Sequence, residues 1–174
     1  MDNSGGTEPI EATLGDRLTA REETVAVAES LTGGLVCSRL TDIPGASAYV
    51  DRGVVTYSNR SKQTVLGVSR ESLDAHGAVS KPVATEMAKG MRDTAETTWA
   101  ISTTGIAGPT GGTDEKPVGL VYIGVAYAAP WGTEGSFVRV TRHGFDGDRT
   151  AVKSKTATEA LTALSKAIDD VTEA

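Results

Sequence analysis

The stretch AESLTGG, residues 28–34, follows the apolar run TVAV (24–27) and precedes the mixed segment LVCSRL (35–40). This order predicts a buried strand over 24–29, a glycine-containing turn and a short helix that begins beside the glycines. At such a turn the backbone N–H groups that follow the strand point outward and can hold an anion or an oxyanion. Ser30 is therefore either a nucleophile presented by the turn or an N-cap of the helix behind it.

Helices and strands alternate on both sides of this turn. The expected elements are a helix from residue 10 to about 21, strands over 48–58 and 99–104, helices over 59–67 and 80–96, a strand hairpin over 118–128 and 135–144, and a final helix that starts after DGDR (146–149). Alternation early in the chain and a hairpin late predict an α/β fold, with a mixed sheet covered by helices on both faces. Residues 1–8 are expected to form a loose tail, and residues 9–174 a single domain, because no repeat or low-complexity linker divides them.

The composition excludes several classes of protein. The 174 residues are 39% hydrophobic and 23% charged, which is typical of a globular domain. The net charge of −6, without a cluster of lysine or arginine, disfavours nucleic acid as a partner. The least polar stretch, residues 118–130, is too short to span a bilayer, and the N-terminus lacks the pattern of a signal peptide. With Cys37 as its single cysteine, the chain is expected to be cytoplasmic, with no membrane partner; whether its acidic, threonine-rich character reflects salt adaptation stays open.

A second candidate segment is TYSNRSK, residues 56–62. Lys62 falls in the first turn of the next expected helix and Tyr57 at a strand end, so both can face Ser30. A lysine acts as a general base only when it is neutral, and burial lowers its pKa toward that state. The alternative is an ordinary solvated lysine on the surface of the helix.

The segment STTGIAGPTGGTDEKPVG, residues 102–119, is a third candidate. Its glycines allow the backbone to approach a ligand and to form amide nests for phosphate or carboxylate, although a simple turn has the same composition. It matches neither the P-loop nor the dinucleotide-binding pattern.

Arg149 enters the first turn of the last helix, where the helix dipole disfavours a cation, so it either binds an anion or pairs with Asp146 or Asp148.

Glu29 and two histidines complete the candidates. Glu29 either contacts a ligand or orients the backbone at the end of its strand. His76 and His143 are isolated, without an H-E-x-x-H motif or a cysteine cluster. No metal and no other cofactor is therefore expected.

Several ordered segments together resemble the CinA C-terminal domain family, the C-terminal domains of competence/damage-inducible proteins. They are AESLTGG, PGASAYVDRGVVTYSNRSK, LDAHGAVS, GIAGPTGGTDEKPVG and GDR, and the resemblance runs from about Thr24 to the last helix. The family includes stand-alone nicotinamide-nucleotide amidases, and this chain resembles that form. The resemblance implies a three-layer α/β/α sandwich with a mixed, mostly parallel sheet. It also implies hydrolysis of nicotinamide mononucleotide to nicotinate mononucleotide and ammonia, a reaction of pyridine nucleotide salvage.

Matching motif by motif, the resemblance also implies roles for individual residues. Ser30 takes the position of the nucleophile, Lys62 that of its activating base, and Tyr57 belongs to the same catalytic segment. The implied substrate-binding residues are Glu29, Thr32, Gly33, Gly34, Ser47, Thr104, Gly105, Gly108 and Arg149. Thr104 stands where many relatives have serine, which keeps a hydroxyl, and Leu31 replaces a common cysteine. Arg149 is expected to hold the 5′-phosphate of the substrate.

In the mechanism that these roles favour, neutral Lys62 removes the proton of Ser30, the serine attacks the carboxamide, and backbone amides near residues 31–34 hold the oxyanion. Two alternatives stay open. Lys62 activates water directly while Ser30 only binds substrate, or the chain is a non-catalytic nucleotide-binding or interaction module. The expected partners are a pyridine nucleotide, whose exact identity stays open, and further copies of the chain in a homodimer or larger homo-oligomer.

Overall fold

A single five-stranded sheet organises the computed structural model, which describes residues 8–173; the predicted tail, apart from Glu8, lies outside the described residues. The strands are β1 (Val25–Glu29), β2 (Val50–Val55), β3 (Trp99–Gly105), β4 (Leu120–Tyr127) and β5 (Phe137–Gly144), in the spatial order β2-β1-β3-β4-β5. Strand β1 pairs in parallel with β2 and β3, and β4 runs antiparallel to β3 and β5. All strands of this sheet except β4 therefore point in one direction, which confirms the predicted mixed sheet. Two of its four strand pairings are parallel and two are antiparallel, so the pairing is not mostly parallel.

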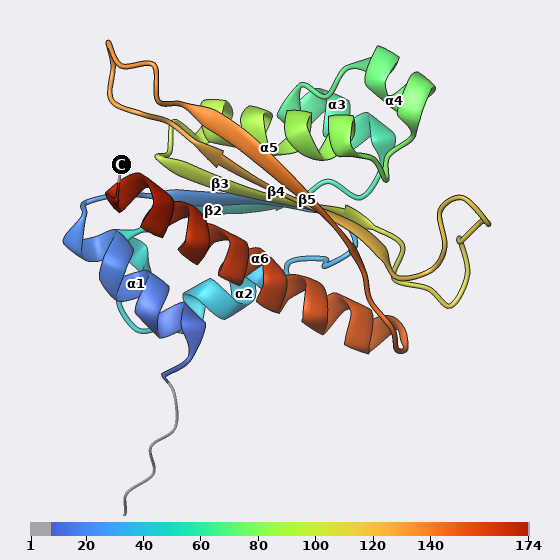
Figure 1. The fold of residues 1–174 in the computed structure, drawn as a ribbon, viewed down its shortest axis with the longest axis horizontal. Coiled ribbons are helices and arrows are strands. Elements are labelled where there is room, and N and C mark those ends of the chain that lie inside the picture. The colour runs from blue at the N-terminus through green and yellow to red at the C-terminus, as the bar shows by residue number, and fades with distance from the viewer. Residues whose placement is uncertain (1–7, 174) are drawn as a thin grey trace, which may run out of the picture.

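Helices cover both faces of the sheet and complete the predicted α/β/α sandwich (Figure 1). One layer consists of α1 (Ile10–Ala20), α2 (Leu35–Thr41) and α6 (Arg149–Thr172), and the other of α3 (Asn59–Leu66), α4 (Arg70–His76) and α5 (Lys81–Ala95). Apart from α4 and a 3₁₀ turn at Ala46–Ala48, these elements lie where the sequence predicts them. The sequence did not reveal α4 because its only buried residue is Leu73, which leaves no periodic apolar pattern.

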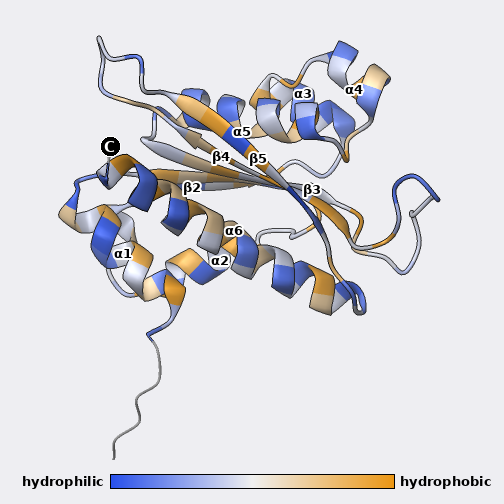
Figure 2. Ribbon diagram, viewed as in Figure 1, coloured by the Kyte–Doolittle hydropathy of each residue, from blue (hydrophilic) through white to orange (hydrophobic). Residues whose placement is uncertain are grey.

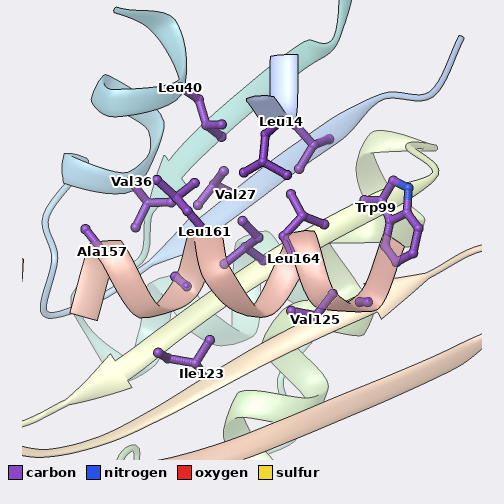
Figure 3. Packing of buried hydrophobic residues seen from close by; sticks show 14 of the residues in the cluster. Leu14, Val27, Val36, Leu40, Trp99, Ile123, Val125, Ala157, Leu161 and Leu164 are labelled. Atoms are coloured by element: carbon purple, nitrogen blue, oxygen red, sulfur yellow. The ribbon is translucent and has the colours of Figure 1, made fainter. Parts of the chain in front are cut away.

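The strand β1 is buried on both faces, so it forms the centre of two hydrophobic clusters. Val25 and Val27 belong to the cluster under α1, α2 and α6, whereas Ala26 and Ala28 belong to the cluster under α5. Figure 3 shows Leu161 and Leu164 of α6 directed at the sheet near Val27. The helices of both layers alternate hydrophobic and hydrophilic segments, as amphipathic helices do (Figure 2).

The strand directions bring several chain segments to one edge of the sheet. Strands β1, β2, β3 and β5 all end at this edge, which we call the carboxyl edge. The segments that leave it are residues 30–34 after β1, 56–58 after β2, 106–119 after β3 and 145–148 before α6. In parallel α/β sheets this is the edge at which ligands bind.

Gly90 of α5 allows the helix α3 to approach α5 closely. A methyl group at this position would overlap with the carbonyl group of Leu66, the last residue of α3. Because α3 also carries Lys62, this contact helps to set the distance between that lysine and the sheet.

We expect Gly90→Ala to lower the free energy of unfolding by about 1–3 kcal/mol, because the added methyl group forces α3 and α5 apart. In an open helix interior the same change stabilises by roughly 0.5–1 kcal/mol. Urea denaturation followed by circular dichroism measures the difference. Thr94→Ala, at an exposed position of the same helix, is the matched control and should stay within about 0.5 kcal/mol of the wild type. A Gly90→Ala variant as stable as the wild type would contradict the close approach.

Candidate active site

Ser30 lies immediately after β1 and is not the cap of the following helix. The N-cap of α2 is Gly34, and no side chain makes a capping bond there. The backbone N–H of Ser30 donates to the carbonyl of Thr103 (3.0 Å), which extends the pairing of β1 with β3 by one residue. Only 9% of Ser30 is exposed, and its hydroxyl oxygen lies 3.2 Å from the Nζ atom of Lys62. The structure therefore excludes the capping interpretation.

Lys62 is buried, which makes the interpretation as a solvated surface lysine wrong. Its exposed fraction is 1%, and it projects from α3, whose N-cap is the Ser58 side chain. Besides Ser30, its Nζ atom contacts the carbonyl oxygens of Thr56 (2.7 Å) and Tyr57 (3.4 Å). Within residues 8–173 no carboxylate pairs with it. Burial therefore lowers the pKa of Lys62 from 10.5 to about 8.

These contacts suit a general base. A protonated lysine has three N–H donors, which match the two carbonyl groups and the serine hydroxyl. When the amine is neutral, two N–H groups still donate to the Thr56 and Tyr57 carbonyls. The lone pair is then directed at Ser30, where it can accept the hydroxyl proton.

Tyr57 and Arg149 join three segments across the carboxyl edge. The Arg149 guanidinium donates to the hydroxyl of Tyr57 (2.9 Å) and to the carbonyl of Gly108 (2.8 Å). Arg149 pairs with neither of the nearby aspartates, Asp146 and Asp148, so the salt-bridge alternative is wrong. Tyr57 remains 60% exposed, and three of the five guanidinium N–H groups remain available for a ligand.

In the glycine-rich segment, backbone conformation and close packing require glycine at two positions. Gly108 has a φ of 80°, a conformation that favours glycine, and a side chain there would meet Val118. A side chain at Gly105 would overlap with the backbone of Leu120. Thr104 is buried beside this loop and donates its hydroxyl to the carbonyl of Ala78 (2.8 Å). Both glycines and Thr104 thus lie at the carboxyl edge; their contact with a substrate stays a prediction.

The turn 30–34 is fixed by its own hydrogen bonds. The N–H of Gly33 donates to the carbonyl of Ser30 (3.1 Å), and Thr32 shares a buried hydroxyl–hydroxyl bond of 2.8 Å with Thr103. Gly33 and Gly34 have φ angles of 60° and 102°, which only glycine adopts at low cost. The predicted turn residues therefore all border the site next to Ser30.

Glu29 does not face this site, so its predicted contact with substrate is wrong. Side chains alternate along a strand, and Glu29 points to the α2 side of the sheet whereas Ser30 points to the α3 side. The buried carboxylate accepts hydrogen bonds from the backbone N–H groups of Val36 (2.9 Å) and Cys37 (3.1 Å). Glu29 thus orients the backbone of α2, which is the alternative that the sequence left open.

Ser47 also lies outside the site within one copy of the chain. It precedes β2, and Val50 at the start of β2 pairs with Val25 at the start of β1. The five residues of β1 separate this edge from Ser30 by about 16 Å. The motif match could not reveal this separation, because the motif spans a whole strand.

A cavity of about 600 Å³ borders the glycine turn on the α2 side. Its lining combines residues of the turn and of α2 with Thr150, Lys153 and Ser154 of α6. The sequence offered one signal for Lys153, its spacing of four residues from Arg149, which places two cations on one face of a helix. A larger cavity of about 690 Å³, lined by Arg92 and Trp131 among others, lies at the opposite edge of the sheet.

Two further features concern the described part of the chain as a whole. In residues 8–173, no group of three or more His, Cys, Asp and Glu side chains is arranged to hold a metal ion. Over the same residues, every helix is too short or too polar to cross a bilayer.

Comparison with known proteins gives a consistent result. Residues 7–168 match the family model described as the CinA C-terminal domain. A CinA-like protein of Anaeromyxobacter sp. (strain K) is 51% identical over 152 residues, which cover 87% of this chain and 36% of that protein. A CinA-like protein of Salinibacter ruber is 50% identical over 90% of this chain and 36% of its own length. The chain thus spans about a third of the curated relatives that it matches.

A solved structure shows the same fold. The crystal structure of the competence damage-inducible protein A from Klebsiella pneumoniae has a TM-score of 0.85 and 35% identity to this chain. The match covers 92% of this chain and 95% of that one.

We expect Glu29→Ala to lower the free energy of unfolding by about 1–3 kcal/mol, because the N–H groups of Val36 and Cys37 lose their buried acceptor. Chemical denaturation measures this loss. Glu115→Ala, at an exposed loop position, is the control and should change stability by less than about 0.5 kcal/mol. An unchanged free energy of unfolding in Glu29→Ala would show that the carboxylate does not hold α2.

Proposed function

The chain belongs to the CinA C-terminal domain family, and from this premise we propose that it is an amidase that hydrolyses nicotinamide mononucleotide to nicotinate mononucleotide and ammonia. One observation carries the proposal. A buried lysine, which pairs with no carboxylate among the described residues, contacts a serine hydroxyl at the carboxyl edge of the sheet. Nucleophile and base side by side are what acyl transfer requires. The direct test is release of ammonia and nicotinate mononucleotide from the nucleotide by the purified protein.

The chemistry proceeds in two stages. In the first, neutral Lys62 accepts the hydroxyl proton as Ser30 Oγ bonds to the carboxamide carbon. The C–N bond then breaks, and Lys62 returns the proton to the departing nitrogen, which leaves as ammonia. The first stage leaves the acyl group bound to Ser30 as an ester. In the second stage Lys62 removes a proton from water, and the water oxygen attacks the carbonyl carbon of this ester. The C–Oγ bond then breaks, and Ser30 regains its proton from Lys62.

The glycine turn supplies donors for the oxyanion. Within the described residues, the N–H groups of Leu31, Thr32 and Gly34 have no backbone acceptor, whereas those of Ser30 and Gly33 are already bonded. Free backbone amides next to the nucleophile stabilise the negative charge that develops on the carboxamide oxygen. Their positions are fixed before substrate arrives, because Glu29 and Thr103 hold the two sides of the turn.

A non-catalytic nucleotide-binding module is the rival function. Such a module would have no use for a buried amine, since removing an unpaired ammonium from water costs several kcal/mol. In an enzyme this desolvation cost has a function, because it lowers the pKa of the lysine and so produces a neutral amine that can act as a base. The geometry therefore favours the enzyme.

We expect kcat/KM to rise with pH and to level off above a midpoint of about 8, the pKa of Lys62 in the free protein. The sign follows from the role, since only the neutral amine is a base. At pH 7, one unit below this pKa, about a tenth of the molecules carry it. Initial rates at subsaturating nucleotide from pH 6 to 10 measure the profile. A rate that is flat across this range, or that falls with pH, would contradict a neutral Lys62.

We expect Ser30→Ala to reduce kcat by more than a factor of about ten, equivalent to more than about 1.4 kcal/mol in the barrier, because no covalent intermediate can form. Ser136→Ala, at the opposite edge of the sheet, is the matched control and should retain wild-type kcat. If Ser30→Ala keeps more than a tenth of the activity, Lys62 activates water directly and Ser30 only binds substrate. Mass spectrometry of the wild-type protein, acid-quenched during turnover of the nucleotide, tests separately for an acyl-serine at Ser30.

A further inference from the structure

The cavity beside the glycine turn has the donors of an anion site. Its lining residues are Thr32, Gly33, Gly34, Leu35, Ser38, Thr150, Lys153 and Ser154. They include one cation and no carboxylate. In the described part of the chain, the hydroxyls of Ser38, Thr150 and Ser154 make no hydrogen bond to other protein groups. The cavity of about 600 Å³ therefore offers uncommitted donors around a single positive charge.

Lys153 reaches across this cavity to the turn. Its Nζ atom lies 3.7 Å from the place that a Cβ atom on Gly33 would occupy. Among residues 8–173 it forms no ion pair and no side-chain hydrogen bond, whereas Lys155 on the same helix is bonded to the carbonyl of Asp146. Lys153 is a half-buried residue whose ammonium group has no partner among the described residues, so it is set to receive an anion.

The two cations in the first turns of α6, Arg149 and Lys153, make different contacts. Arg149 and Lys153 are four residues apart, and two like charges at this spacing destabilise a helix by roughly 0.2–0.5 kcal/mol. The structure separates them by directing Arg149 to Tyr57 and Gly108 at the mouth of the site and Lys153 to the cavity. Arg149 is thus partly committed to the protein, while Lys153 is not.

We infer that this cavity binds the phosphate monoester of the nucleotide substrate and that Lys153 is its principal cation. The inference rests on the proposed amidase function and replaces Arg149, the residue that the sequence suggested for the phosphate. The hydrogen bond from Gly33 to Ser30 closes a turn whose ends lie within about 7 Å of each other. A nucleotide that crosses this turn has its carboxamide at Ser30 and its phosphate at Lys153, with the ribose between them.

The test uses the full chain with Ser30→Ala, so that binding is measured without turnover. Isothermal titration compares nicotinamide mononucleotide with nicotinamide riboside, which has the same amide and no phosphate. Lys153→Gln in this background should weaken binding of the nucleotide by about ten- to a hundredfold, as expected for one charge-assisted hydrogen bond, and barely change binding of the riboside. Lys153→Arg, which keeps the charge, should retain most of the preference for the nucleotide. Lys166→Gln, at an exposed position further along α6, controls for net charge.

Each outcome decides the inference. It is wrong if the preference for the nucleotide survives Lys153→Gln, or if the Ser30→Ala protein binds nucleotide and riboside equally. If the preference for the nucleotide is lost in Arg149→Ala but not in Lys153→Gln, Arg149 and not Lys153 binds the phosphate. Failure of the amidase function has a different signature. The wild type would release no ammonia from the nucleotide, while the Lys153-dependent preference remained.

Discussion

The burial of the Lys62 amine against Ser30 is the constraint on which the site depends. An ammonium group removed from water loses several kcal/mol of solvation, and no carboxylate within residues 8–173 pairs with Lys62 to offset that loss. Two carbonyl oxygens, from Thr56 and Tyr57, provide the acceptors instead. Carbonyl groups satisfy the N–H donors without the full charge that would hold the proton in place. The same contacts therefore keep the lysine ordered and leave its pKa low enough for a base.

The fold supplies these contacts through the direction of its strands. The carbonyls come from the end of β2, the serine from the end of β1, and the lysine from the helix that follows β2, so the parallel pairing of β1 and β2 brings all three together. On the far side of β1, the Glu29 carboxylate fixes the start of α2 and with it the glycine turn. Adjacent residues of one strand thus serve opposite layers, with Glu29 holding the scaffold and Ser30 facing the base.

Local sequence predicted the fold well, because the apolar residues whose spacing identifies each helix or strand are the same residues that pack into the core. Helix α4 was missed since a short element with one buried residue has no period to detect. The site was harder to predict, because the choices that mattered depend on contacts between distant residues. Whether Ser30 caps a helix, whether Lys62 is solvated and which way Glu29 points are all decided by contacts between layers. Ser47 shows another limit of sequence motifs: the motif that contains it is contiguous in sequence but extends over both edges of the sheet, so it does not place Ser47 beside Ser30 within one chain.

The two layers place different chemical environments at the same edge of the sheet, as the two ends of the proposed nucleotide substrate would require. On the α3 side the groups around Ser30 are a low-pKa amine and neutral carbonyls, which suit an uncharged carboxamide. On the α6 side a cation and free hydroxyls border a cavity, which suits an anion. The glycine turn separates these environments, and Gly33 and Gly34 add no side chain between them. Arg149 spans the same edge from α6 to Tyr57, so the position of the tyrosine beside the base is coupled to the helix that carries Lys153. An anion held on the α6 side would act on the same helix turn that positions Tyr57, which gives phosphate binding a physical route to the amide site.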